Sequence, residues 1–254
     1  MILAIDVGNS NVVIGCIDGD KIPYVFRMVT DSLKTEDEYA AGIKSILKFN
    51  DIDPEGFSGA AISCVVPPLS TAICSAAKRL TGTTPFVVGS GIKTGLNILI
   101  DNPAELAADM VASAVGALSR YPVPAITIDL GTATKICVID SNRGFLGGAI
   151  CPGVALSSDA LSRGASLLPR ITIEAPKKVI SSGTRECMQS GSVYGTAAMI
   201  DGMVQRMEEE LGEKTTVIAT GGIAAQIIPH CKTEIVHEPN LILHGLRVLY
   251  EKNR

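Results

Sequence analysis

The sequence predicts an α/β protein built from two similar halves, and three observations support this fold class. Short β-branched runs alternate with longer stretches of helical period along the chain. The length of 254 residues is large for one domain and suits two domains of modest size. A strand-turn-strand pattern that begins at Leu3 returns at Ile126, at a constant offset of 123 residues.

The composition excludes two broad classes of protein. Hydrophobic residues make up 46% of the chain and charged residues 19%, which excludes a disordered protein. The 22 basic residues are outnumbered by 26 acidic ones, and there are five Phe, five Tyr and no Trp. A nucleic-acid-binding protein needs a basic surface or a set of stacking rings, so we expect no nucleic-acid partner.

The compartment is predicted from the cysteines and from the apolar segments. The seven cysteines are dispersed, odd in number and free of any C-x-x-C pair, which favours reduced thiols. The amino terminus does not resemble a signal peptide, and Glu105 and Asp109 interrupt the longest apolar stretch. We therefore expect a cytoplasmic protein that does not span a membrane.

The first half begins with a predicted antiparallel meander. Three consecutive strands are expected over residues 2–7, 12–17 and 24–28. The turn at Asp18-Gly19-Asp20 is typical of a hairpin, because glycine readily adopts a positive φ.

Alternating helices and strands follow this meander. Thr35, with Asp37 and Glu38 behind it, predicts the amino-terminal cap of a helix. Asn102-Pro103 predicts the start of a later helix. The expected elements are a helix over 35–48, a strand over 60–66, a helix over 69–80, a strand over 85–88 and a helix over 104–119.

The segment Tyr121-Pro122-Val123-Pro124 is the predicted linker, because its prolines stop a helix and favour extended chain. The expected domains are therefore residues 1–121 and 122–254. In the second, a strand over 216–220 ends in Gly221-Gly222, and a helix is expected over 241–251.

The repeated feature is a strand that ends in an Asp-x-Gly turn. Residues 3–10 align with residues 126–133, so Asp6 and Gly8 correspond to Asp129 and Gly131. Such a turn can present backbone N–H groups to an anion, and a cation can bridge the carboxylate to a phosphate. Two ordinary hairpins are the alternative interpretation. The repetition favours a nucleotide-phosphate clamp between duplicated halves.

Two further features have both a functional and a structural interpretation. Asp109 lies in an otherwise apolar helix, where a carboxylate can also serve to complement the helix dipole. Gly221-Gly222 follows an apolar strand and allows a flat ligand to approach the backbone, or it forms a tight turn. No Walker A loop, dinucleotide fingerprint, nucleophile elbow or metal-binding histidine spacing is present.

Taken together, the motifs resemble those of type III pantothenate kinases, which belong to the superfamily of acetate kinase, sugar kinases and actin. The resemblance runs nearly end to end. It rests on the two turns at 6–11 and 129–134 and on six further segments: Lys93-Thr94-Gly95, Asp101-Asn102-Pro103-x-Glu105, Gly147-Gly148-Ala149-Ile150-x-Pro152-Gly153, Leu168-Pro169-Arg170, Met188-Gln189-Ser190-Gly191 and Thr220-Gly221-Gly222.

This resemblance implies two RNase H-like domains of the actin-like ATPase type, with mixed β-sheets flanked by helices, in a homodimer. It implies a kinase, a phosphotransferase with an alcohol acceptor. This enzyme phosphorylates pantothenate to 4'-phosphopantothenate, the first step of coenzyme A biosynthesis. It also implies ATP, Mg²⁺ and a monovalent cation, K⁺ or NH₄⁺, as cofactors.

The resemblance also implies roles for individual residues. Asp109 is the expected general base, Asp129 the expected ligand of the monovalent cation, and Asp6 a candidate Mg²⁺ ligand. The expected ATP-binding residues are Asp6, Val7, Gly8, Asn9, Ser10, Asn11, Val12, Val13, Thr132, Gly221 and Gly222. The expected substrate-binding residues are Ile100, Ala107, Ala108, Asp109, Met110 and Thr184.

Several positions depart from the family pattern. The substrate motif Gly-x-Asp-Arg reads Ala107-Ala108-Asp109-Met110 here, and Ile100 replaces an aromatic residue. Lys135 replaces the threonine that normally follows the second turn. These changes leave two alternatives open: a non-catalytic or regulatory paralogue, and a kinase of a different small hydroxyl compound. The retained Asp6, Asp109, Asp129 and Thr132 oppose the non-catalytic alternative.

Overall fold

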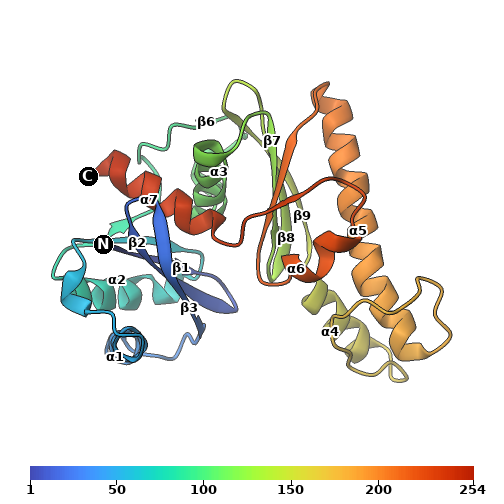
Figure 1. The fold of residues 1–254 in the computed structure, drawn as a ribbon, viewed down its shortest axis with the longest axis horizontal. Helices are drawn as coiled ribbons and strands as arrows, with labels where there is room; N and C mark the ends of the chain where they lie inside the picture. The colour runs from blue at the N-terminus through green and yellow to red at the C-terminus, as the bar shows by residue number, and fades with distance from the viewer. The chain divides into compact units, whose positions relative to one another are not determined.

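The computed structural model describes all 254 residues, which form two compact units (Figure 1). The first unit contains Met1–Gly95, Asn102–Arg120 and Leu241–Arg254, and the second contains Leu96–Asp101 and Tyr121–Asn240. These units differ from the predicted domains 1–121 and 122–254 at two places, because the last helix belongs to the first unit and residues 96–101 belong to the second.

The sheet of the first unit has five strands in the order β3-β2-β1-β4-β5. Strands β1, β2 and β3 form the predicted antiparallel meander, and Gly19 at its second turn, between β2 and β3, has a φ of 57°. Strands β4 and β5 continue the sheet in parallel with β1. The strands are β1 (Ile2–Val7), β2 (Asn11–Asp18), β3 (Lys21–Val29), β4 (Ala60–Cys64) and β5 (Phe86–Val87).

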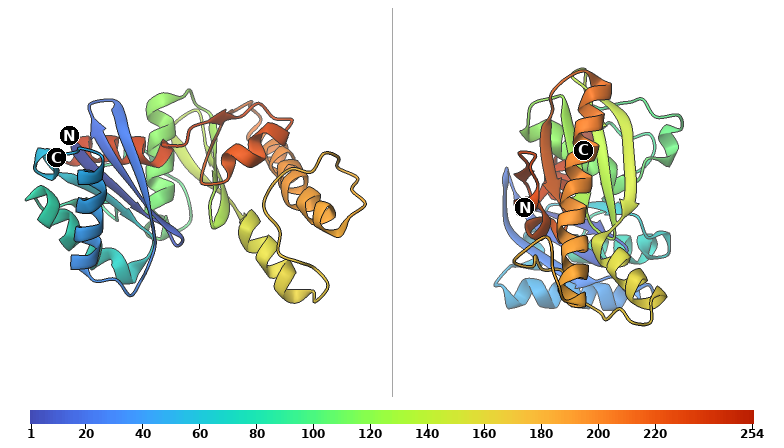
Figure 2. Two further views of the ribbon diagram at one scale, coloured as in Figure 1. Left: turned by 60° about the horizontal axis from the view of Figure 1, so that its bottom comes forward. Right: turned by 90° about the vertical axis from the view of Figure 1, so that its right-hand side faces the viewer.

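Four helices cover the two faces of this sheet, as Figures 1 and 2 show. Helices α1 (Glu36–Phe49) and α2 (Pro67–Thr81) pack on the face that holds Leu3 and Ile5, where they form one apolar core. Helices α3 (Ala108–Arg120) and α7 (Leu241–Asn253) pack against each other and against β4 on the opposite face.

Helix α7 belongs to the first unit because its apolar side packs onto β1 and β4. Leu241, Leu243, Leu246 and Leu249 are all buried. Gly15 on β2 leaves room for this packing, since a Cβ atom there would lie 2.8 Å from the Cδ1 atom of Leu243. Arg247 also forms an ion pair with Asp20, at 2.9 Å. No pattern in the local sequence of 241–251 shows which sheet this helix covers.

The helix boundaries confirm one sequence prediction and correct another. Thr35 caps α1 in a capping box with Glu38, as predicted. The helix expected over 104–119 is instead a 3₁₀ turn, η2 (Pro103–Glu105), followed by α3 from Ala108. Asn102 caps the 3₁₀ turn, and the extended backbone of Leu106 (ψ 117°) separates it from α3. As a result, Asp109 lies in the first turn of its helix.

The sheet of the second unit has six strands in the order β11-β10-β7-β8-β9-β6. The two-residue strand β6 was not predicted, and it adds to the edge of β9 through the N–H of Leu99, which donates to the carbonyl oxygen of Phe145 at 2.9 Å. The strands are β6 (Asn97–Ile98), β7 (Ala125–Leu130), β8 (Ala133–Ile139), β9 (Gly144–Pro152), β10 (Thr216–Thr220) and β11 (Val236–His237).

The core of the second unit lies between this sheet and helix α5 (Thr184–Leu211). Ile126, Ile128 and Leu130 of β7 pack there with Val193 and Ile200 of α5. Helices α4 (Val154–Gly164) and α6 (Ala224–Ile227) add Val154, Ala224 and Ile227 to the same core. No element was predicted between residues 144 and 215, so β9, α4 and α5 are known from the structure alone.

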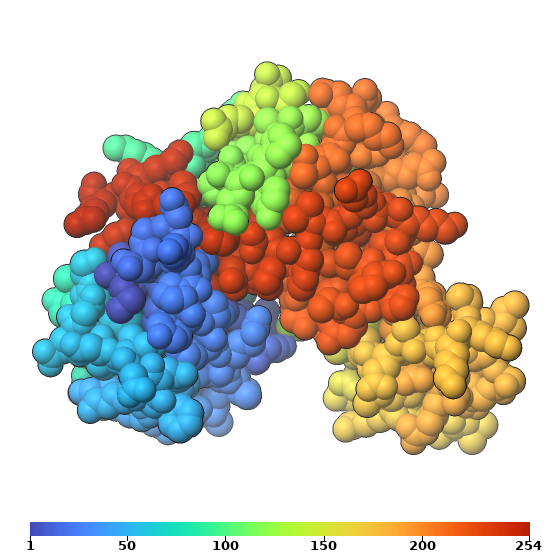
Figure 3. Space-filling model, in the orientation of Figure 1, coloured from blue at the N-terminus to red at the C-terminus, as the bar shows by residue number.

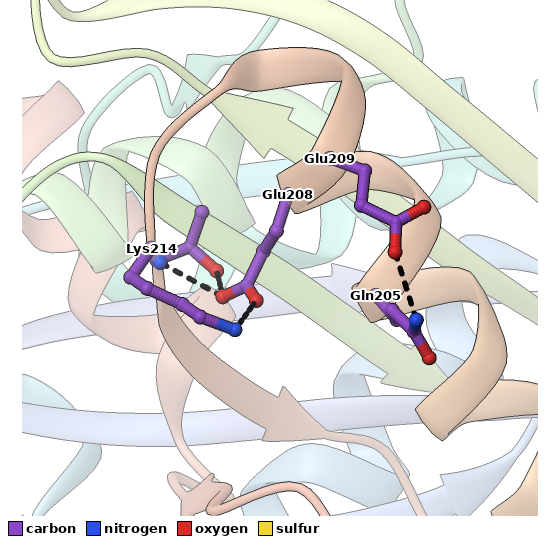
Figure 4. A network of polar contacts seen from close by, with 5 residues as sticks. Gln205, Glu208, Glu209 and Lys214 are labelled. Atoms are coloured by element: carbon purple, nitrogen blue, oxygen red, sulfur yellow. Dashed lines mark hydrogen bonds and ion pairs between the residues drawn. The ribbon is translucent and has the colours of Figure 1, made fainter.

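A polar network ties the carboxyl end of α5 to the start of β10 (Figure 4). The Glu208 carboxylate accepts hydrogen bonds from Lys214 Nζ at 2.6 Å and from the backbone N–H of Thr215 at 2.9 Å. Partial burial alone would raise the pKa of Glu208, but these hydrogen bonds outweigh it and lower the pKa. The carboxylate therefore stays ionised near neutral pH and fixes the connection.

The predicted internal repeat is present at the level of strand pairing. Strands β1 and β2 pair antiparallel with Asp6 opposite Val13, and β7 and β8 pair antiparallel with Asp129 opposite Lys135. Each unit therefore contains a strand with an aspartate next to its last residue, followed by a turn into an antiparallel neighbour. No helix of the chain combines the length and apolar character needed to cross a membrane.

The contact between α3 and α7 gives a test of the first unit. A Cβ atom at Gly245 would lie 1.8 Å from the carbonyl oxygen of Ala112, so the two helix backbones touch. We expect Gly245→Ala to lower the free energy of unfolding by about 1–3 kcal/mol, because the helices must separate. Urea denaturation followed by circular dichroism measures this loss.

The matched control is Gly195→Ala on α5, where a Cβ atom would meet nothing within 4 Å. That change should be neutral or stabilise by up to about 1 kcal/mol, since alanine favours a helix. Equal stability of Gly245→Ala and the wild type would show that the helices do not pack this closely in solution.

Candidate functional site

The first predicted phosphate turn lies at the end of β1. The N–H of Gly8 donates to the carbonyl oxygen of Asn11 at 3.0 Å and closes the turn. Thr30 of the neighbouring loop holds the turn with two hydrogen bonds. Its hydroxyl donates to the carbonyl oxygen of Gly8 at 2.6 Å, and its backbone N–H donates to the carbonyl oxygen of Ser10 at 3.1 Å. Asn9, Ser10 and Asn11 remain exposed at the tip. The turn is rigid at its base and open to a ligand at its tip.

The side chain of Asp6 lies on the face of the sheet that α3 and α7 cover. Side chains alternate along a strand, and Leu3, Ile5 and Val7 belong to the core on the α1–α2 face. Asp6 therefore points to the opposite face, where it is 9% exposed. Ser63 of β4 is its partner in the parallel register and is fully buried, with no hydrogen-bond partner for its hydroxyl oxygen.

Asp109 reaches the same face of the same unit from helix α3. It is 8% exposed, and its Oδ1 atom accepts a hydrogen bond from the backbone N–H of Met110 at 2.7 Å. Ser113 lies one turn later on α3, also buried and without a partner for its hydroxyl oxygen. The tertiary structure thus brings buried carboxylates and hydroxyls from β1, β4 and α3 to one face. A carboxylate in such a setting can accept a proton from a substrate hydroxyl.

The second predicted phosphate turn joins β7 to β8 in the second unit, and two glycines pack directly against it. A Cβ atom at Gly153 would lie 2.3 Å from the carbonyl oxygen of Thr132, and one at Gly221 would lie 2.5 Å from that of Leu130. Gly221 also has a φ of 102°, which favours glycine. The structure therefore places Gly221 against the Leu130 end of the turn that carries Thr132.

Asp129 at this turn forms an ion pair with Lys135. The Nζ atom of Lys135 lies 2.8 Å from Oδ2 of Asp129, and the two side chains are 17% and 16% exposed. The two residues face each other across the β7–β8 ladder. From the sequence, Lys135 is only a departure from the family pattern. The contact of Lys135 with Asp129 follows from the register of β7 and β8.

The predicted substrate residues divide between the two units. Ala107, Ala108 and Met110 flank Asp109 at the start of α3 and are partly exposed. Ile100 belongs to the second unit, where its Cγ2 atom is 3.5 Å from the place of a Cβ atom at Gly147. Thr184 is exposed at the first turn of α5, also in the second unit. Ser63, Ser113 and Thr30 were missed, because a lone hydroxyl residue has no sequence signature.

The cysteines form no disulfide. All seven cysteines are free thiols, and burial raises the pKa of Cys16 to about 11 and that of Cys231 to about 12. No three His, Cys, Asp or Glu side chains lie close enough together to hold a metal ion by themselves.

The chain is similar to known proteins over its full length. The profile of the family described as type III pantothenate kinase matches residues 2–206. Type III pantothenate kinases from Exiguobacterium sp. and Halalkalibacterium halodurans are 44% and 43% identical to the chain. Each alignment covers 100% of both chains.

Solved structures with low sequence identity share the fold. A Campylobacter jejuni protein described as a Baf family transcriptional activator aligns over 99% of this chain and 98% of its own, with a TM-score of 0.63 and 17% identity. MreB 5 of Spiroplasma citri, solved with AMPPNP, aligns over 98% of this chain and 96% of its own, with a TM-score of 0.53 and 10% identity. The two mixed sheets flanked by helices are thus the actin-like ATPase fold. The family profile and the full-length relatives show that the chain belongs to the type III pantothenate kinase family.

Proposed function

We propose that the chain transfers the γ-phosphoryl group of ATP to the terminal hydroxyl of pantothenate and forms 4'-phosphopantothenate, the first step of coenzyme A biosynthesis. The observation that supports this most strongly is the placement of Asp109. Its buried carboxylate belongs to helix α3, which packs on the same face of the first sheet as the Asp6 side chain. Full-length relatives named type III pantothenate kinase, at 42–44% identity, favour this over the non-catalytic alternative.

In this proposal Asp109 orients the pantothenate hydroxyl and accepts its proton as the oxygen attacks the γ-phosphorus atom. Phosphoryl transfer depends mainly on positioning and on charge stabilisation, so one aligned carboxylate is sufficient as the base. The hydrogen bond from the N–H of Met110 at 2.7 Å fixes the orientation of the Asp109 carboxylate. Burial strengthens its interaction with the hydroxyl proton, because water does not screen it.

In each unit the Asp-x-Gly turn would be a contact for the phosphates of ATP, and in the second unit Gly221-Gly222 would add to that contact. Carboxylate and hydroxyl oxygens are the donors that Mg²⁺ prefers, and Asp6 beside Ser63 supplies both in one register. The donor set at Asp6 therefore fits Mg²⁺, which would neutralise charge on the phosphates when bound. A monovalent cation at Asp129 is the remaining cofactor that the family resemblance implies.

The general base is tested by Asp109→Asn. We expect kcat to fall by about 10²- to 10⁴-fold, because the amide cannot accept the hydroxyl proton, while ATP affinity is retained. Coupled-enzyme kinetics and calorimetric titration with AMPPNP measure the two quantities. Asp37→Asn is the matched control, since Asp37 is also an acidic residue in the first turn of a helix. An undiminished kcat in Asp109→Asn would remove Asp109 from the chemistry.

The acceptor pocket is tested by restoring the family motif. The double variant Ala107→Gly with Met110→Arg adds a hydrogen bond to a charged ligand, worth roughly 1.5–3 kcal/mol, so KM for pantothenate should fall about 10- to 150-fold. The KM for ATP should not change. A pantothenate KM that is unaltered or higher would mean that the chain binds the acceptor in another way, which would favour a different small hydroxyl compound.

We also propose that the protein acts as a homodimer in the cytoplasm, where the seven free thiols would stay reduced. Helix α4 and the segment at 165–183, yellow to gold in Figure 3, form one surface region of the second unit. Large apolar side chains are exposed in and beside it, namely Ile150, Leu156, Leu161, Leu167, Val179 and Ile180. Extended apolar surface of this kind is typical of an interface.

The dimer is tested by Leu167→Glu with Ile180→Glu, two positions that are 90% and 91% exposed. We expect light scattering after size exclusion to give twice the chain mass for the wild type and the chain mass for the variant. Phe49→Glu, at an equally exposed apolar position of the first unit, should leave the wild-type mass unchanged. A monomeric wild type would contradict the proposal.

A further inference from the structure

The ion pair between Asp129 and Lys135 lies at the base of the second phosphate turn, where β7 and β8 pair. The Lys135 Nζ atom is 2.8 Å from Asp129 Oδ2, and both side chains are more than four-fifths buried. The Asp129 carboxylate also lies over the turn itself, because its Oδ1 atom is 3.4 Å from the place that a Cβ atom at Gly131 would occupy. The lysine therefore brings a positive charge to the residues that the proposed function assigns to nucleotide binding.

Strand register holds this charge in place. Asp129 and Lys135 are directly opposite each other in the β7–β8 ladder, so their side chains point to the same face of the sheet. Ile128 and Ile136, the neighbours of this pair, belong to the core on the other face. A change in register would expose these isoleucines, so the core keeps Lys135 against Asp129.

The residues present do not fit an exchangeable monovalent cation at Asp129. An alkali ion or ammonium ion needs oxygen donors around it, and the Asp129 Oδ2 atom already accepts a hydrogen bond from an ammonium group. Lysine has three N–H donors, no acceptor and a full positive charge, so it would repel a second cation. The threonine expected from the family pattern would instead offer a neutral oxygen.

We infer that the Lys135 ammonium group takes the place of the monovalent cation, so that nucleotide binding needs no K⁺ or NH₄⁺. A tethered ammonium supplies the same charge as a free NH₄⁺ ion, at a fixed position. This inference rests on the proposed function only in that Asp129 lies at the nucleotide. It concerns a specific lysine and does not depend on the acceptor.

The test compares the wild type with Lys135→Thr, using the intact chain and two readouts besides activity. Calorimetric titration measures the affinity for Mg²⁺–AMPPNP in K⁺, NH₄⁺ and choline chloride at one ionic strength. Thermal unfolding measures Tm in the same salts. The wild type should give the same affinity and Tm in all three salts. Lys135→Thr should bind about 10-fold or more weakly in choline and recover in K⁺ or NH₄⁺, because the ion then replaces the lost charge.

Lys214→Thr is the matched control. It removes a lysine from another ion pair of the same unit, the one with Glu208, and should create no dependence on the cation. A wild type whose nucleotide affinity or Tm rises specifically with K⁺ or NH₄⁺ would overturn the inference. This comparison uses the wild-type protein alone. A Lys135→Thr protein that folds but is rescued by neither ion would overturn it too, since the lysine would then serve only structure or contact the phosphates directly.

Kinase activity separates this inference from the proposed function. Cation-independent nucleotide binding without phosphorylation of pantothenate would refute the function and leave the inference intact. If the wild type phosphorylates pantothenate only in the presence of K⁺, the inference is refuted and the proposed function stands.

Discussion

Both units depend on the two-residue period of one central strand, β1 in the first unit and β7 in the second. In β1 the residues Leu3, Ile5 and Val7 build the core on one face, and this directs Asp6 to the other. In β7 the residues Ile126, Ile128 and Leu130 do the same for Asp129. A slip of one residue would bury both carboxylates in apolar cores at a prohibitive cost. The hydrophobic core and the functional face are therefore specified by one and the same register.

The functional face of the first sheet is completed by helices that approach each other unusually closely. Gly116 and Gly245 let the backbones of α3 and α7 touch, and α7 in turn packs onto β1 and β4. This packing holds the first turn of α3, and with it Asp109, on the face where Asp6 and Ser63 are buried. A carboxylate held in this way needs little reorganisation to meet a hydroxyl group, which is what a phosphotransfer base requires. The second unit uses the same principle when Gly153 and Gly221 press against the turn at 130–132.

Much of the fold could be predicted where structure depends on neighbours in the sequence. The strand at 2–7, the Thr35 cap and the repeat of the Asp-x-Gly turn follow from alternation, capping chemistry and self-similarity, and all three are present. The start of α3 was misplaced because Asn102-Pro103 caps a 3₁₀ turn as readily as an α-helix. Strand β6 has only two residues, too few for a periodic pattern, and exists because β9 offers it an edge. Ser63 and Ser113 had no signature at all, since their relevance comes from burial beside carboxylates.

The sequence by itself determined the α/β class, the opening strands of the first half, the two aspartate turns and the family to which their motifs belong. These are local properties, decided by spacing along the chain and by the conformations that Gly, Pro and Asp allow. Only the tertiary structure decided that α7 completes the first unit, that Asp109 shares a face with Asp6, and that Lys135 pairs with Asp129. The first two depend on segments more than a hundred residues apart, where burial of apolar surface, rather than any local pattern, selects the partner. The third depends on the β7–β8 register, which the apolar core imposes from the opposite face of the sheet.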